Sequence, residues 1–485
     1  MSELTKRKGV TTATALDVGS PPSSSSGVEA SIRAVEFDIR PSCAHEPPVR
    51  YLVQNEQLLP TIRGAPIAQQ SAVARYWACC SLNGLTRELK EMFLPAGYPD
   101  SVSEDYLTFQ FWDTMQAMCS YLRGVLATQS VLQSVGVGDD KATPLAAALQ
   151  WVLRDGSGMI GGLTFAYVVG PKFDMNVKRW RLFADVINDV GLTLDMIAPY
   201  FPSLVTEILC VSSVCKTMCG VAAGSTRSSL MTHFAKRDNM ADCAAKEGSQ
   251  ETAVKLFGLI FGMYFANAVN SSKDSVWVAF ILLTLVHVFA NFNAVSCLCI
   301  PTLNRQRAHI LVERFLEGSS SSAADSKDMK NEPQTFHPFS IRSVNLVEPI
   351  FRDPELPITR IIMGAQLFQT APTSQDLERL LQLYSDESYL LSVQGDLVCV
   401  VFEADMSPRD ELRAFFQAVL VLQALQRSTL PVATTELPLE LLQTTYQRMC
   451  TDFDFFFQQI QSHGWKTHMF LLNTSQWRIK LNDQA

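Results

Sequence analysis

The sequence predicts a mainly α fold, in which a membrane-associated helical core precedes a smaller C-terminal α+β domain. The 25 residues from Val276 to Ile300 contain no ionisable acidic or basic side chain except His287. A helix of this length extends about 37 Å, more than the roughly 30 Å of hydrocarbon in a bilayer. Beyond about residue 335 the composition becomes that of a soluble domain, with helix-capping and hairpin patterns.

The first segments of the chain lack the pattern of a packed core. Residues 1–33 are predicted to be a disordered tail, because they are polar and contain the serine run Ser23–Ser26. Residues 34–68 contain short β-favouring pieces broken by prolines, which predicts a short β-containing arm. No apolar segment follows the basic residues Lys6–Lys8, so we expect membrane insertion to depend on internal helices.

Residues 69–316 are predicted to form the helical core, with membrane segments near 203–225, 256–270 and 276–300. The last segment is long enough to cross, whereas 256–270 is short for a full crossing. The segment 203–225 contains Glu207 and Lys216, each of which costs about 2.5–3.5 kcal/mol at mid-bilayer. It would cross only if these two groups face a partner or a wet cavity.

Glycine spacing also indicates closely packed helices in the core. Glycines four residues apart lie on one helix face and let two backbones approach closely. Three such pairs occur, at Gly158/Gly162, Gly220/Gly224 and Gly258/Gly262. They predict tight helix packing, either in lipid or in a dense soluble bundle.

The remainder of the chain divides into a linker and a second domain. Residues 317–334 are rich in serine and mixed charges, which predicts a flexible linker. Residues 335–485 are predicted to be an α+β domain. Its patterns are a capped helix from Thr373, a hairpin of 389–394 and 397–403, and a helix that begins at Pro408.

Composition excludes several classes of function. A net charge of −8 and a pI near 5.5 argue against nucleic acid as the main partner. The 12 cysteines form no CxxC pair and the seven histidines are scattered. We therefore expect free buried thiols and no metal site.

A first group of polar residues in the core could bind a small anion. On a helix, the basic residues of the block 178–181 would lie near acidic and amide side chains at three- and four-residue spacing. The alternative is that these residues bind no ligand and form paired charges on an interfacial helix. The candidate ligand residues are Arg154, Asp155, Lys178, Arg179, Arg181, Asp185, Asn188 and Asp189.

A second polar group follows the Gly220/Gly224 pair, where Ser249 is predicted to cap a new helix whose free N-terminus could hold an anion. Its candidate ligand residues are Arg227, His233, Lys246, Gln250 and Glu251. Neither a phosphate-loop nor a GxSxG motif accompanies them, so no catalytic residue is predicted. His287 and Asn291 are predicted intramembrane polar residues, with a neutral interhelical hydrogen bond as the alternative role for His287.

Many short motifs occur in an order that resembles the Root UVB sensitive family. The match covers about residues 70–310, and the linker and C-terminal domain also resemble that family. Ser225 departs from it, because we expect alanine after Gly224. The matching motifs are Phe93–Pro95, Gly97–Pro99, Ser101–Val102, Asp105–Tyr106, Trp112–Asp113, Trp151–Gly156, Lys178–Arg181, Asn188–Asp189, Gly220–Gly224, Asn239–Asp242, Lys246 and Gly248–Glu251.

The resemblance implies a membrane-associated protein of the non-plant type, linked to vitamin B6 homeostasis, whose family paralogues act together. It supplies neither an agreed reaction nor catalytic residues. We therefore expect a non-enzymatic membrane protein for homeostasis or transport of a small anionic metabolite, or a membrane scaffold. Its expected partners are the lipid bilayer and itself or a paralogue, with no resident cofactor. The Arg305/Arg307 flank places the C-terminal domain in the cytosol. The alternative is a soluble or peripheral pyridoxal phosphate-binding protein or enzyme.

Overall fold

The computed structural model describes residues 50–54, 57–62, 65–66, 82–135, 144–320, 337–351, 359–427, 437–471 and 477–480. The predicted tail, 1–33, and most of the predicted linker lie outside these residues. The chain divides into two compact units. One contains the residues up to Glu104 together with Phe234–Thr252, and the other contains Asp105–His233 and the residues from Ala253 onward.

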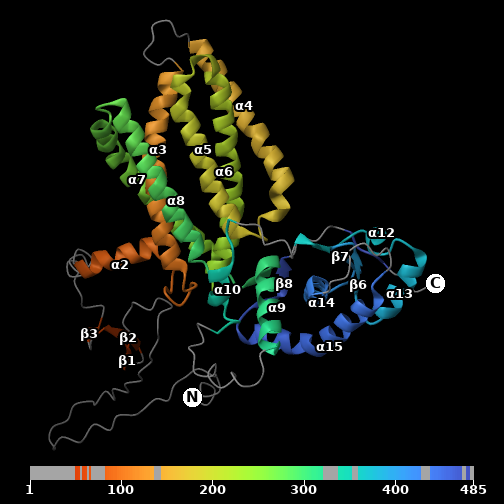
Figure 1. Cartoon of the computed structure of the whole chain (residues 1–485). Coiled ribbons are helices and arrows are strands. Elements are labelled where there is room, and N and C mark those ends of the chain that lie inside the picture. The colour runs from red at the N-terminus through yellow and green to blue at the C-terminus, as the bar shows by residue number, and fades with distance from the viewer. Residues whose placement is uncertain are drawn as a thin grey trace, which may run out of the picture. The chain divides into compact units, whose positions relative to one another are not determined.

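The second unit begins with a bundle of long helices, of which α7 belongs to this unit from Ala253 onward (Figure 1). Contacts between them show that α3, α5 and α7 run in one direction, whereas α4, α6 and α8 run in the opposite direction. This alternation follows from the short connections between consecutive helices. The bundle helices are α3 (Tyr106–Ser134), α4 (Pro144–Val169), α5 (Val177–Ile197), α6 (Val205–Phe234), α7 (Met240–Val269) and α8 (Lys273–Ser296), with short 3₁₀ turns η3 (Gly170–Lys172), η4 (Ala198–Tyr200) and η5 (Pro202–Leu204).

Among the described residues, three helices are long and apolar enough to cross a membrane. They are α6, α7 and α8, and they cover the three predicted segments. The predicted segment 256–270, short for a crossing by itself, forms most of the second half of the 30-residue helix α7. Helix α8 ends at Ser296, before the predicted Ile300, because Pro301 disfavours helical backbone just before it.

Two of the three glycine pairs lie at close helix contacts. A Cβ built on Gly158 would come within 2.4 Å of Ser213 Oγ, and one on Gly162 within 2.4 Å of Thr217 Cγ2, so these glycines let α4 pack against α6. A Cβ on Gly258 would meet the ring of Tyr121 on α3 at 2.5 Å. Gly220 and Gly224 have no such neighbour within 4 Å among the described residues, so the predicted role for this pair was wrong.

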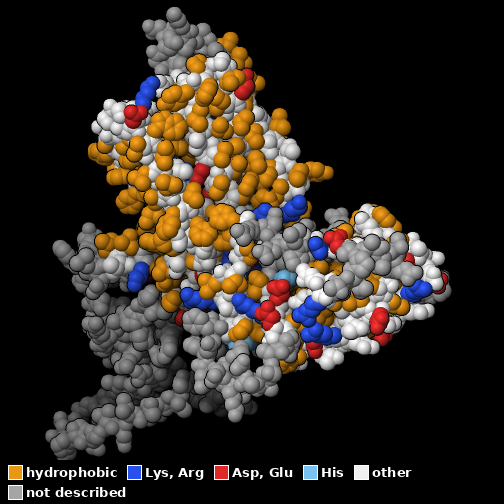
Figure 2. Space-filling model, in the orientation of Figure 1, with side chains coloured by type: hydrophobic (Ala, Val, Ile, Leu, Met, Phe, Trp, Pro, Cys, Tyr) orange, Lys and Arg blue, Asp and Glu red, His pale blue; other side chains and the backbone are white. Residues whose placement is uncertain are grey.

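Large apolar side chains remain exposed on the bundle. Figure 2 shows hydrophobic side chains over most of its visible face, with few charged ones between them. In the most apolar stretches of α6, α7 and α8, only 17% to 22% of the residues are buried. On α4, Leu163 and Tyr167 are 73% and 87% exposed. The bundle therefore presents an apolar outer surface and keeps polar groups inside, the reverse of a water-soluble helix bundle.

The same unit continues into an α+β domain, which confirms the predicted fold class. The sheet order is β5-β7-β6, with β6 and β7 antiparallel as the hairpin pattern predicts, and β4 pairs with β8 in parallel. Its strands are β4 (Thr302–Asn304), β5 (Ile361–Met363), β6 (Tyr389–Gln394), β7 (Leu397–Phe402) and β8 (Lys466–Leu471). Its helices are α9 (Arg305–Ser320), α10 (Ile341–Val347), α12 (Leu367–Thr370), α13 (Ser374–Leu383), α14 (Pro408–Arg427) and α15 (Leu439–Ser462).

The predicted starts of two helices in this domain are confirmed. The Thr373 hydroxyl accepts the backbone N–H of Asp376 at 3.1 Å, so it caps α13. Pro408 begins α14, where its missing N–H costs nothing. The apolar faces of α9, α14 and α15 pack with the sheet into one core. Helix α9 continues through Ser320, so the first residues of the predicted linker, 317–320, are helical.

The first unit contains a small sheet and a helix. Strands β1 (Arg50–Gln54), β2 (Gln57–Ile62) and β3 (Ala65–Pro66) form an antiparallel sheet within the predicted arm. Helix α2 (Leu82–Phe93) follows. The backbone N–H of Ala96 donates to the Asp242 carboxylate at 2.7 Å, which ties the turn after α2 to the start of α7.

Candidate functional site

Helices α3, α5 and α8 enclose an ion pair between Arg123 and Asp189. Arg123 Nη1 lies 2.7 Å from Asp189 Oδ1, and the two side chains are 0% and 9% exposed. The guanidinium group stays charged at any ordinary pH, so its burial requires a negative partner. Asp189 supplies that charge from the neighbouring helix.

Helix α8 adds two polar side chains to the same ion pair. His287 Nδ1 lies 3.1 Å from Asp189 Oδ2, and His287 is fully buried. Since an ionised carboxylate only accepts, the proton is assigned to Nδ1. Thr284 Oγ1 accepts from Arg123 Nη1 at 3.3 Å. One helical turn separates the threonine from the histidine, which places both on the face toward Asp189.

The polar contacts continue along the bundle toward the C-terminal domain. Asn291 Nδ2 donates to Asp185 Oδ2 at 2.6 Å. Arg181 Nη2 donates to Asp113 Oδ1 at 2.7 Å, between half-buried side chains. The interior of α3, α5 and α8 is thus lined with alternating positive, negative and amide groups. We call Arg123, Asp185, Asp189, His287 and Asn291 the buried polar network.

Three nitrogens of the network have no hydrogen-bond partner among the described residues. They are Arg123 Nε, Arg123 Nη2 and His287 Nε2, and all three are buried. Buried donors are nearly always paired in folded proteins, because an unpaired one costs about 1–3 kcal/mol. The two arginine groups form a fork of the kind that carboxylates and phosphates bind. Arg123 therefore offers two donors of the kind that a small anion would need, whereas His287 Nε2 is an acceptor when Nδ1 carries the proton.

A second polar contact joins α5 to α6. Ser212 Oγ donates to Asp195 Oδ1 at 2.6 Å, and Lys216 forms an ion pair with the other oxygen of the same carboxylate. Asp195 is 2% exposed. The ion pair offsets the free-energy cost of a lysine in an apolar helix, because Lys216 faces a negative partner inside the bundle.

A third buried cluster joins the bundle to the α+β domain. Glu348 Oε2 lies 3.1 Å from Lys178 Nζ, and Glu348 Oε1 lies 3.0 Å from Arg307 Nε. Burial alone would raise the pKa of the Glu348 carboxyl, but Arg307 and Lys178 outweigh it and hold the pKa below its usual value. Burial lowers the pKa of Lys178 despite the pull of Glu348. The cluster connects the start of α5, α9 and the segment after α10.

Comparison with known proteins places both regions in one family. Residues 81–319 match the model described as "Vitamin B6 photo-protection and homoeostasis domain", and residues 338–481 match "Root UVB sensitive protein, C-terminal". The chain is 32% identical to Protein root UVB sensitive 3 of Arabidopsis thaliana over 85% of this chain and 91% of that protein. The chain belongs to the Root UVB sensitive family. It is also 44% identical to RUS family member 1 of Dictyostelium discoideum over 52% of this chain and 48% of that protein. No solved structure matches.

In this Root UVB sensitive chain, the predicted basic block does not converge on one ligand. Lys178 points to Glu348 and Arg181 to Asp113, whereas Arg179 is exposed. Arg179 faces another side than its neighbours because successive helical residues are about 100° apart, whereas Lys178 and Arg181 lie one turn apart along the helix and reach different partners. The prediction of a shared lining from these three residues was therefore wrong. Asn188 Nδ2 reaches Ser120 Oγ at 3.5 Å on α3, beside the network.

The other predicted ligand residues lie apart from the network. The Arg154 guanidinium group stacks 4.4 Å from the ring centre of Trp151, and Asp155 is exposed at 62%. His233 Nε2 lies 2.8 Å from Asp105 Oδ2 near the end of α6, and Arg227 is half-buried on that helix.

Within the first unit, the Lys246 ammonium donates to the backbone oxygen of Glu91. Gln250 Nε2 donates to Phe93 O at 2.6 Å, and Glu251 is exposed. Ser249 does not cap a helix, because α7 begins at Met240 and the Ser249 hydroxyl donates to Ala245 O within it. The predicted anion-binding N-terminus at this point was wrong.

Sequence reasoning missed Arg123, the positive centre of the network in this Root UVB sensitive chain. A signal for it exists, since Arg123 is the one charged residue between Thr114 and Gly138. A lone ionisable residue in an apolar helix usually faces the interior of a bundle. Glu348 was missed as well, because its partners Lys178 and Arg307 are distant in sequence.

Proposed function

We propose that this chain is an integral membrane protein in which α6, α7 and α8 cross a bilayer. The observation that carries the proposal is the exposure of large apolar side chains along these helices. On α7, Phe257, Met263 and Tyr264 are 66%, 64% and 72% exposed. On α8, Val278 and Leu285 are 66% and 63% exposed. Water disfavours apolar surface by about 25 cal/mol per Å², whereas lipid tails do not.

The dimensions of α8 support the same proposal. Its 24 residues extend about 36 Å, slightly more than the roughly 30 Å of hydrocarbon. Ser272 caps it, with the Ser275 N–H donating to Ser272 Oγ at 3.1 Å. Three of its polar residues, Thr284, His287 and Asn291, face the interior of the bundle rather than the outer surface. A spanning helix with an apolar outer face and a paired polar inner face satisfies its polar groups without water.

Within the membrane, the proposed role is to bind a small anionic metabolite for homeostasis or transport, without catalysing a reaction. The vitamin B6 name of the matching domain suggests a phosphorylated B6 vitamer as that metabolite. The fork of Arg123 supports an anion as the ligand, because it offers two further donors inside the bundle. Asp185 accepts from Asn291 and Asp189 pairs with Arg123, so both carboxylates are engaged within the bundle.

We further propose that the α+β domain lies in the cytosol, since Arg305 and Arg307 follow α8 closely and basic residues favour the cytosolic flank. Partners in addition to lipid would be a second copy or a family paralogue.

Extraction of membranes with alkaline carbonate tests membrane embedding. We expect the full chain to stay in the pellet with integral proteins and to be solubilised by detergent. Release into the supernatant would overturn the proposal and favour the alternative, a soluble or peripheral protein that binds pyridoxal phosphate.

The proposed binding of an anionic metabolite needs a separate measurement. Calorimetric titration of the detergent-solubilised chain with pyridoxine 5′-phosphate should show saturable binding. No saturable binding would remove this ligand class. The phosphate ester is preferable to pyridoxal phosphate, because it lacks the aldehyde that forms Schiff bases with surface lysines.

A further inference from the structure

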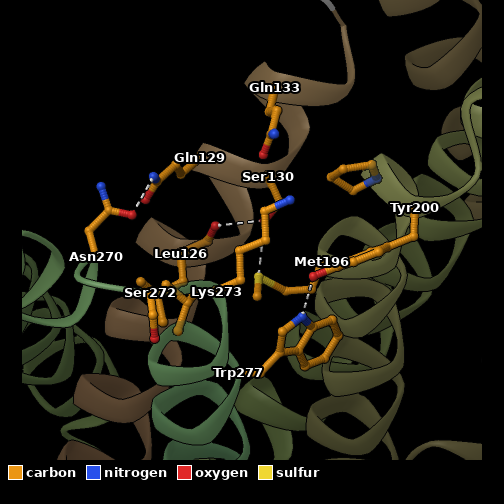
Figure 3. A pocket seen from close by; sticks show the side chains of 12 residues that line it. Leu126, Gln129, Ser130, Gln133, Met196, Tyr200, Asn270, Ser272, Lys273 and Trp277 are labelled. Carbon is orange, nitrogen blue, oxygen red and sulfur yellow. Dashed lines mark hydrogen bonds between the residues drawn. The ribbon is translucent and has the colours of Figure 1, made fainter.

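A cavity of about 350 Å³ lies at one end of the bundle. Figure 3 shows side chains from the end of α3, the end of α5 and the start of α8 around it. We propose that this cavity is the binding site for a small, single-ring compound that carries a negative group. The proposal rests on the proposed function in one respect only, which is the choice of a phosphorylated B6 vitamer as the test compound. None of the residues around the cavity was predicted as a ligand residue.

The floor and one wall of the cavity suit a flat apolar ring. Leu126 and Met196 form the floor and are 1% and 2% exposed. Trp277 and Tyr200 form the wall, with ring centres 6.2 Å apart. Trp277 Nε1 donates to the Tyr200 hydroxyl at 2.9 Å (Figure 3), which fixes both rings. A preformed aromatic wall reduces the entropy lost on binding, and the cavity volume is at the small end for ligand sites.

The rim of the cavity suits a polar, negatively charged substituent. Lys273 is the one charged residue among the lining residues that the structure describes, and its side chain is exposed. Gln129 Nε2 donates to Asn270 Oδ1 at 3.2 Å, and Gln133 completes the amide part of the rim. A compound with its ring against Trp277 could place its anionic group near Lys273. None of the lining residues that the structure describes carries a carboxylate to oppose that charge.

An apolar layer separates the cavity from the buried polar network. Leu126, Met196 and Phe280 pack together in this layer and are nearly fully buried. Arg123 lies one helical turn from Leu126 on α3, on the far side of the layer. The cavity is therefore a site distinct from the Arg123 fork. Since α8 runs about 36 Å from Lys273 to Ser296, the cavity opens at the end of the bundle away from the α+β domain.

Calorimetric titration of the full chain in detergent tests this proposal with three probes. Pyridoxine 5′-phosphate combines the ring and the charge, pyridoxine has the ring alone, and inorganic phosphate has the charge alone. We expect saturable binding of the ester, at least tenfold weaker binding of pyridoxine and no binding of inorganic phosphate. Equal binding of the ester and of inorganic phosphate would overturn a site built around a ring.

Variants locate the binding to the cavity. Lys273→Gln should weaken the ester at least tenfold and leave pyridoxine unchanged, and Val276→Trp, which fills the cavity, should abolish both. Lys172→Gln removes the same charge from an exposed site at the other end of the bundle and should change neither. Circular dichroism of each variant checks that it folds.

The failure of this proposal can be told apart from failure of the proposed function. The cavity site would be overturned if Lys273→Gln and Val276→Trp left ester binding unchanged. Loss of ester binding in Arg123→Gln would then keep the buried polar network as the anion site. Carbonate extraction that releases the chain would overturn membrane embedding, whereas binding that depends on Lys273 would still support the cavity.

Discussion

Arg123 on α3 and Asp189 on α5 form an ion pair whose charged atoms are 2.7 Å apart and almost completely buried. Neither charge has a tolerable environment without the other, because an unpaired charge in a low-dielectric interior costs several kcal/mol. The pair therefore fixes the register of α3 against α5. His287 on α8 contacts the same carboxylate, so the third helix is positioned as well.

The first prediction concerns this ion pair. Arg123→Met should lower the free energy of unfolding by about 3–5 kcal/mol, since it leaves Asp189 buried without its partner. The double variant Arg123→Met/Asp189→Leu should recover most of that loss, which thermal unfolding in detergent measures as coupling. Arg179→Met, an exposed arginine on α5, is the control and should change stability little. Losses that simply add in the double variant would contradict the pairing.

The second prediction concerns the Glu348 cluster and acid. Glu348→Gln should destabilise the chain by about 3–5 kcal/mol near neutral pH, because Lys178 and Arg307 lose their negative partner. Because the folded state holds the pKa of Glu348 below its ordinary 4.5, the carboxylate's contribution is present above that pH. It is lost as the pH falls through the folded pKa. The stability difference between wild type and variant should therefore shrink in acid.

Unfolding of both proteins between pH 3 and pH 7, followed by circular dichroism, measures this difference. Glu313→Gln is the control, because the Glu313 side chain is exposed and its pair with His309 is expected to contribute only about 0–1 kcal/mol. A difference that grows in acid would refute the assignment.

The third prediction uses the glycines as matched probes. Gly158→Ala should lower stability by about 1–3 kcal/mol, since its Cβ would come within 2.4 Å of Ser213 Oγ. Gly220→Ala meets no described residue within 4 Å and should be neutral or gain up to about 1 kcal/mol from helix propensity. Thermal unfolding in detergent compares the two. Equal effects would show that α4 and α6 do not approach as closely as the structure indicates.

The fourth prediction concerns Glu411 in the α+β domain. Burial raises the pKa of Glu411 to about 7 from an ordinary 4.5, although Arg478 opposes the shift. Between these values the folded chain keeps a proton that the unfolded chain releases. The free energy of unfolding should therefore fall as the pH rises through this window, by up to about 3 kcal/mol.

Glu411→Gln removes that dependence and should be more stable than wild type at pH 8. Hydrogen exchange of the α14 amides, compared between the two proteins at one pH, measures this. Glu440→Gln, at an exposed residue in the first turn of α15, should have no such effect. An unchanged exchange rate in Glu411→Gln at pH 8 would contradict the burial of a proton there.

Local sequence patterns predicted the helices and the hairpin. The side chains of the candidate site are brought together by contacts between elements that are distant in sequence. Helix α8 and the hairpin β6–β7 follow from periodicity and turn residues within a few positions. The spacing of Asp185 and Asp189 placed both on one helix face, and the structure brings them to His287 and Asn291.

The partners across the bundle could not be predicted in the same way. Asp189 is paired with Arg123 on α3, 66 positions earlier in the chain, and no local pattern links them. Lys178 was grouped with Arg181 because they are neighbours in sequence, but they lie one helical turn apart, where Lys178 reaches Glu348 and Arg181 reaches Asp113. The cavity escaped prediction because helix ends that are far apart in sequence assemble it.

The most direct test of the account asks whether the two ends of α8 lie on opposite sides of a bilayer. Sealed vesicles containing the chain would be labelled with a membrane-impermeant maleimide from outside, or from both sides after permeabilisation. Ser271→Cys adds a thiol at an exposed position just before α8, and Cys450→Ser removes an exposed thiol from the α+β domain. We predict that only one of these changes alters outside labelling, and that the other does so only after permeabilisation. Outside labelling changed by both substitutions in intact vesicles of uniform orientation would contradict a membrane-crossing α8.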